Sequence, residues 1–103
     1  MATSFGSSGA LIVGQKAVTT AGTALQLDST SPKRLVTSVA ITAKVGNTGN
    51  VFIGGSDVAS STNAGYEPGT AIRMSNKPRG LDLSDIYIDV AVDGEGVDFI
   101  ATI

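Results

Sequence analysis

The spacing of the apolar residues constrains the fold of this chain more than any other feature. They come in short alternating runs separated by clusters of Gly, Asn, Asp or Pro, and no stretch of ten or more residues sustains a helical period with caps. Val, Ile and Thr are frequent, and such β-branched residues suit a pleated sheet better than a helix. The sequence therefore predicts an all-β fold: a compact antiparallel β-sandwich or jelly-roll-like barrel of short strands.

The predicted strands are short, and turn residues separate them. In the longest, Leu35–Val45, alternation predicts one core-facing row. That row holds Leu35, Thr37, Val39, Ile41, Ala43 and Val45. Residues 46–49 (GNTG) predict a tight turn into a return strand, which directs either Phe52 or both Val51 and Ile53 at the core, depending on the loop length. The full set of predicted strands is Leu11–Val18, Thr23–Leu27, Leu35–Val45, Val51–Ile53, Thr70–Met74, Ile86–Val92 and Val97–Ile103.

The clearest predicted element is a hairpin of Ile86–Val92 and Val97–Ile103 around a four-residue loop, Asp93–Gly96. With that loop, every facing pair on one side of the hairpin is apolar. The pairs are Val92 with Val97, Val90 with Phe99, Ile88 with Ala101, and Ile86 with Ile103. The opposite face, which includes Asp89 and Asp98, is mixed in polarity and would suit partial burial at a subunit contact.

The chain of 103 residues is long enough for one domain, which we expect over residues 11–103. Residues 1–10 are predicted to be a flexible N-terminal arm, because Gly and Ser dominate them and they carry no charged side chain. Phe5 is their large apolar group and would anchor the arm if it orders against a neighbour; the alternative is plain terminal disorder.

The residue types argue against an enzyme and against a cofactor. The sequence has no Cys and no His, so thiolate and imidazole metal sites and Ser-His hydrolases are not expected. Two carboxylate pairs, Asp82 with Asp85 and Asp93 with Glu95, could act in a glycosidase, but such a site also needs a cleft and aromatic platforms, and there is no Trp. We expect no catalytic residue, no metal site and no cofactor.

Charge is divided unevenly along the chain. Residues 1–79 hold all seven Lys and Arg with three acids, whereas residues 80–103 hold six acids and no base. An acidic last quarter does not suit nucleic acid, and no apolar segment is long enough to span a membrane. The N-terminus lacks the pattern of a signal peptide, so we expect the protein to be made in a cytoplasm.

The candidate contact residues for a capsid or a second copy are Phe5, Lys33, Arg34, Arg73, Lys77, Arg79, Asp89, Asp93, Glu95 and Asp98.

Three segments resemble small virion proteins of tailed bacteriophages. Residues 47–54 (NTGNVFIG) are similar to the family's NTGxVYVG segment, and residues 81–89 (LDLSDIYID) with 94–100 (GEGVDFI) are similar to its LDLxxIYID…GEGVxF ending. Residues 18–27 (VTTAGTALQL) are similar to its early TAxxL strand. The family is that of head decoration, or cement, proteins. The resemblance implies a homotrimer on the outer capsid surface of a virion, bound to the major capsid protein across capsomer boundaries.

Two other functions remain open from the residues. A glycan-binding module of a head fibre or tail appendage would present an aromatic shelf around Tyr66 or Tyr87. A small hydrolase would bring Asp82 and Asp85 together in a cleft, about 5–10 Å apart.

Overall fold

The protein is an antiparallel all-β protein, as the sequence predicts. The computed structural model describes residues 11–28, 35–61, 64–76 and 79–102. Every strand pairing in these ranges is antiparallel. The elements are β1 (Leu11–Ala17), β2 (Leu25–Gln26), β3 (Leu35–Val36), β4 (Ser38–Ala43), β5 (Val51–Gly54), β6 (Ala71–Ser75), β7 (Leu81–Asp82), the 3₁₀ helix η2 (Leu83–Asp85), β8 (Tyr87–Val90) and β9 (Gly96–Thr102).

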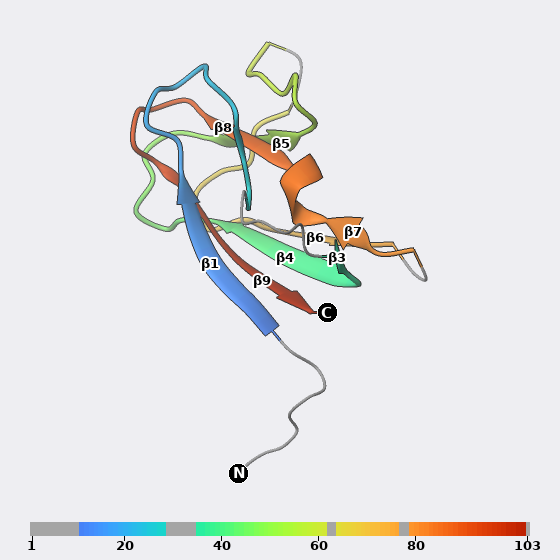
Figure 1. Ribbon diagram of the computed structural model, residues 1–103. Coiled ribbons are helices and arrows are strands. Elements are labelled where there is room, and N and C mark those ends of the chain that lie inside the picture. Colours follow the sequence, from blue (N-terminus) through green and yellow to red (C-terminus); the bar gives the residue numbers. More distant parts are fainter. Residues whose placement is uncertain (1–10, 29–34, 62–63, 77–78, 103) are drawn as a thin grey trace.

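The largest sheet has the strand order β1-β9-β4-β6. The last strand of the chain, β9, lies in its interior between β1 and β4 (Figure 1). Along β9 the odd-numbered Val97, Phe99 and Ala101 are buried, whereas Asp98 and Ile100 are exposed. This alternation gives the sheet an inner face that contributes to the core and an outer face that meets solvent.

The other strands form a three-stranded sheet, β2-β8-β5, and a two-stranded ribbon, β3-β7. All three groups of strands contribute to one hydrophobic core. Its buried members are Ile12, Val18, Leu27, Val36, Val39, Ile41, Ala43, Val51, Leu83, Ile86, Ile88, Val90, Val97, Phe99 and Ala101. Phe99 reaches this core over Gly14, where a Cβ atom would lie 2.7 Å from the tip of the ring.

The predicted C-terminal hairpin is wrong. β8 belongs to the three-stranded sheet and β9 to the four-stranded sheet, so the loop at 93–96 carries the chain from one sheet to the other. The end of β1 holds this loop: the Val18 amide donates to the Glu95 carbonyl (2.9 Å), and the Gly94 amide donates to the Val18 carbonyl (2.8 Å). Of the residues predicted to face the core, Ile86, Ile88, Val90, Val97, Phe99 and Ala101 are buried, although they come from two sheets. Val92, which was paired with Val97 in the predicted hairpin, is 40% exposed.

The turn at 46–49 is also a crossing and does not close a hairpin, because β4 and β5 lie in different sheets. Neither predicted register of the following strand is correct by itself. Val51 and Phe52 are both buried, with 0% and 7% of their surfaces exposed, and Ile53 is half-buried. Two successive buried residues are possible because β5 has covered surface on both of its faces.

The predicted long strand Leu35–Val45 is two strands that pair with different partners. β3 pairs with β7, and β4 pairs with β6 and β9. Thr37 separates them, and the alternation shifts there: Val36 is buried and Leu35 is exposed, the reverse of the prediction. The predicted core row is confirmed for Val39, Ile41 and Ala43, but Val45 lies exposed in the following turn.

The other predicted strands lie within a few residues of β1, β2, β5 and β6. The predicted N-terminal arm, residues 1–10, and the predicted core residue Ile103 lie outside the described residues.

Candidate functional site

The carboxylate of Glu95 joins two loops of the protein. Its Oε2 accepts hydrogen bonds from the amide (2.7 Å) and the hydroxyl (2.8 Å) of Thr48, and its Oε1 accepts one from the Gly49 amide (3.0 Å). The backbone hydrogen bonds from Gly49 and Thr48 lower the pKa of Glu95 below its ordinary value of 4.5, more than desolvation raises it. Glu95 thus fastens the 46–50 turn to the 93–96 loop.

Asp89 and Asp93 accept hydrogen bonds from a third loop, which contains Ala21 and Gly22. Asp93 Oδ1 accepts from the Ala21 amide (2.7 Å), and Asp89 Oδ1 accepts from the Gly22 amide (2.9 Å) and from the amide of Val90 (2.8 Å). Gly22 has φ +92°, a left-handed conformation that favours glycine. Asp89 is 1% exposed and lies in the interior, so its predicted place at a contact surface offers almost no area to a partner.

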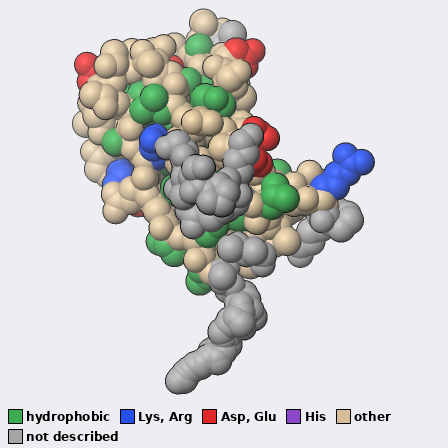
Figure 2. Space-filling model, viewed as in Figure 1, with side chains coloured by type: hydrophobic (Ala, Val, Ile, Leu, Met, Phe, Trp, Pro, Cys, Tyr) green, Lys and Arg blue, Asp and Glu red, His purple; other side chains and the backbone are tan. Residues whose placement is uncertain are grey.

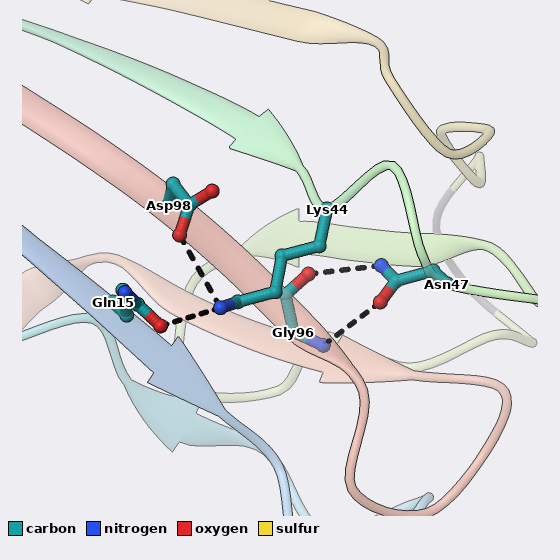
Figure 3. A network of polar contacts seen from close by, with 5 residues as sticks. All are labelled: Gln15, Lys44, Asn47, Gly96 and Asp98. Carbon is teal, nitrogen blue, oxygen red and sulfur yellow. Dashed lines mark hydrogen bonds and ion pairs between the residues drawn. The ribbon is translucent and has the colours of Figure 1, made fainter.

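A polar network on the outer face of the four-stranded sheet joins three of its strands or their ends (Figure 3). Lys44 lies just after β4, and its Nζ is 3.4 Å from Oδ1 of Asp98 on β9. The same ammonium group donates a hydrogen bond to Oε1 of Gln15 on β1. Beside it, the Asn47 side chain donates to the Gly96 carbonyl (2.9 Å) and accepts from the Gly96 amide (3.4 Å). Asp98, a predicted contact residue, therefore pairs within its own chain.

Three of the four candidate catalytic carboxylates, those of Asp82, Asp93 and Glu95, accept hydrogen bonds that organise loops, and Asp85 is exposed. Asp82 caps η2 by accepting from the amide (2.9 Å) and the hydroxyl (2.7 Å) of Ser84, and Asp93 and Glu95 bind the loops described above. No cluster of three or more metal-ligating side chains occurs in the part of the chain that the structure describes. Within the same part, no helix is long and apolar enough to cross a membrane.

The predicted basic contact residues are only partly described. Arg73 is exposed on β6 and Arg79 is exposed in the turn before β7, whereas Lys33, Arg34, Lys77 and also Phe5 lie outside the described residues. Tyr66 and Tyr87, the two alternative centres for the aromatic shelf of a glycan site, are both half-buried. Tyr66 is tied to Val51 by two backbone hydrogen bonds of 2.8 and 3.0 Å.

An apolar area on the outer face of the four-stranded sheet was not predicted. Val13 of β1 lies directly opposite Ile100 of β9, and these side chains are 69% and 52% exposed. Leu11, two residues before Val13 on the same face, is 62% exposed. We call Leu11, Val13 and Ile100 the apolar patch. In Figure 2, hydrophobic side chains reach the surface in the lower part of the molecule, where this sheet lies.

The apolar patch continues into a shallow hollow of about 270 Å³ on the same face. Across the sheet, Ile100 lies opposite Ala40 of β4, and Ala40 lies opposite Arg73 of β6. Val13, Ile100, Ala40 and Arg73 thus form one row across the four strands. The row begins with apolar side chains on β1 and β9 and ends with a cation on β6. The residues that line the hollow are Ser38, Val39, Ala40, Arg73, Ile100 and Thr102.

Sequence alternation could have indicated this patch only in part. Leu11, Ile12 and Val13 are all apolar, so the alternating pattern does not say which of them face outward. Ile100 was expected on the mixed face of β9, and it is exposed there. Comparisons with models of known protein families, with curated proteins and with solved structures found no match.

Proposed function

We propose that this protein is a non-enzymatic structural component of a bacteriophage virion. In this proposal it decorates the outer surface of the capsid, binds the major capsid protein across capsomer boundaries and stabilises the shell, as a homotrimer. The observation that carries the proposal is the apolar patch of Leu11, Val13 and Ile100 on the outer face of the four-stranded sheet. The resemblance of residues 47–54 and 81–100 to decoration proteins supplies the kind of partner.

The apolar patch supports binding to another protein surface for a simple physical reason. Single exposed apolar side chains are ordinary, but adjacent large ones on a flat face mark an interaction surface. Covering such a side chain stabilises a complex by about 1.5–3 kcal/mol when it becomes fully buried. A shell presents many copies of the partner, so several modest contacts add up through multivalency.

The segments that resemble decoration proteins support the proposal through the scaffold. Residues 47–49 and 94–96 are those that Glu95 and Asn47 tie together, so the shared motif builds the end of the sheet that carries Lys44 and Asp98. We also propose that the two larger sheets form a β-sandwich of the jelly-roll kind. The core they share supports this arrangement.

Co-sedimentation with expanded capsids that lack a decoration protein tests the function. The purified protein is expected to pellet with these capsids and to raise the temperature at which they break open. Ile100→Ser removes an exposed branched side chain from the patch and is expected to weaken binding about tenfold, the equivalent of about 1.4 kcal/mol.

Val45→Ser is the matched control, because Val45 is 83% exposed in a turn after β4 and lies outside the patch. It should bind capsids like the unchanged protein. An unchanged protein that neither pellets with capsids nor protects them from heat would defeat the proposal. If that same protein bound a defined glycan instead, the function would be that of a fibre or tail module.

A further inference from the structure

The four-stranded sheet has two edges, β1 and β6, and both are unpaired among the described residues. The hydrogen-bonding directions of their backbone groups follow from the interior strands. The Gly96 and Thr102 carbonyls of β9 accept from Lys44 and Thr37, so the even-numbered residues of β9 point toward β4. Its odd-numbered residues therefore point toward β1, since an antiparallel strand alternates between its two neighbours.

This alternation determines which residues of β1 bond to β9. Val97, Phe99 and Ala101 lie opposite the even-numbered residues of β1. The amides and carbonyls of the odd-numbered residues then point away from the sheet. These residues are Leu11, Val13, Gln15 and Ala17. Their side chains are also the exposed ones, so backbone groups and apolar side chains are presented by the same residues.

The same reasoning applies to β6 at the opposite edge. Ala43 of β4 bonds to Thr70 and Gly69, so the odd-numbered residues of β4 point toward β6. Their partners Ile72 and Met74 use their backbone groups in this ladder. The backbone groups of Ala71, Arg73 and Ser75 point outward. Unpaired edges of this kind are templates for a further strand.

We propose that copies of this protein associate head to tail, with β1 of one copy pairing with β6 of the next to extend the four-stranded sheet. The strand directions permit this pairing. Because each neighbouring pair in the order β1-β9-β4-β6 is antiparallel, the first and last strands run in opposite directions. A second copy in the same orientation therefore presents its β1 antiparallel to β6, and the outward backbone groups of both strands belong to residues of the outer face.

The side chains favour one register of this pairing. With Val13 opposite Arg73 of the next copy, Leu11 faces Ser75 and Gln15 faces Ala71. These three pairs exchange about six backbone hydrogen bonds. On the inner face Ile12 meets Met74, which is half-buried and already packs against the core of its own copy.

A two-fold pairing of β1 with a second β1 is less favourable. If the two copies of β1 pair along their whole length, Gly14 lies at the centre of the pairing. Lys16 of one copy then lies opposite Ile12 of the other on the inner face. In the head-to-tail register Lys16 lies past the end of β6, opposite Thr70. A head-to-tail contact forms a closed ring when the rotation from each copy to the next adds up to a full turn. The number of three copies rests on the proposed function.

Blocking each edge separately tests the inference. Val13→Pro removes an outward amide from β1, and Arg73→Pro removes the equivalent amide from β6; proline is tolerated where the amide of an edge strand faces solvent. Multi-angle light scattering without capsids should give a trimer for the unchanged protein and a monomer for each variant. An equimolar mixture of the two variants should form a one-to-one dimer, because one intact β1 and one intact β6 remain.

Each other result overturns the inference. A monomeric unchanged protein would do so, as would an Arg73→Pro variant that associates normally, or a mixture that stays monomeric. Leu11→Pro and Ser75→Pro, at strand ends, repeat the test if a first variant does not unfold cooperatively. Ile100→Ser, which changes the outer face but no edge amide, should remain a trimer. A trimer that ignores capsids would defeat the proposed function alone.

Discussion

At the residue scale, most of the described acids after residue 80 act on the protein's own backbone. Asp82, Asp89, Asp93 and Glu95 each accept from at least one backbone amide. A carboxylate that accepts such hydrogen bonds contributes more than a neutral acceptor, because charge strengthens the bond. The acidic last quarter of the chain thus organises loops, and most of its carboxylates bind groups of the same chain.

Replacing Asp89 tests this role where burial is greatest. Asp89→Ala leaves the Gly22 amide without its acceptor and removes a hydrogen-bonded charge from the interior, which should lower the free energy of unfolding by about 3 kcal/mol. Asp85→Ala, at an exposed position in η2, should change it by less than about 0.5 kcal/mol. Urea denaturation monitored by circular dichroism measures both. Equal, small effects would show that the Asp89 contacts contribute little.

Glu95 should make stability depend on pH in the acid range. Its pKa in the folded protein is lowered from 4.5, so the ionised form is favoured by folding. The stabilisation is therefore fully present above pH 4.5 and is lost as pH falls through the lowered pKa. Glu95→Gln is expected to be less stable than the unchanged protein at pH 7, with a difference that shrinks below pH 4.5. The urea midpoints of the unchanged protein and of Glu95→Gln, taken at pH 7 and again below pH 4.5, measure this difference in stability. Glu67→Gln, at an exposed position, is the control.

At the element scale, the sequence predicts where most strands lie but not which strands pair. Alternation reports that Ile88, Val90, Val97 and Phe99 face a core. It holds equally for two strands of one hairpin and for two strands in separate sheets, so the pattern of apolar pairs around residues 93–96 could not distinguish them. The loops that decide between these arrangements are held by tertiary hydrogen bonds, such as those that Glu95 accepts from Thr48 and Gly49, and no local sequence pattern contains them.

The passage of the chain from β8 into β9 depends on Gly96. A Cβ atom there would lie 2.0 Å from the Lys16 carbonyl oxygen and 2.7 Å from the Ala17 Cα, both in the backbone of β1. Gly96→Ala should push β1 away from β9 and lower the free energy of unfolding by at least about 2 kcal/mol. Hydrogen exchange should show lost protection along β1.

Gly46→Ala is the matched control for that substitution, because a Cβ at Gly46 would meet no atom within 4 Å. Its exchange pattern along β1 should be unchanged. If Gly96→Ala were as stable as Gly46→Ala, the close approach of the two backbones would not limit the fold.

At the scale of the whole molecule, the two candidate self-contacts differ in how they respond to salt. The uneven charge along the sequence suggests a contact between basic and acidic patches, but Asp98 pairs with Lys44 and the neighbouring acids bind loops. The proposed strand edges carry one charged outward residue, Arg73. Backbone hydrogen bonds between the two edges are screened little by ions, whereas exposed charge pairs are screened strongly.

Self-association should therefore survive high salt. Raising the salt concentration from about 0.01 M to about 1 M shortens the Debye length from about 30 Å to about 3 Å, which removes most of the attraction between exposed charges. We expect the mass measured by sedimentation equilibrium to remain that of the proposed trimer across this range, because apolar and backbone contacts do not depend on long-range attraction. Dissociation at the higher salt concentration would instead indicate that charged side chains hold the copies together, and the pairing of β1 with β6 would then not be the main contact.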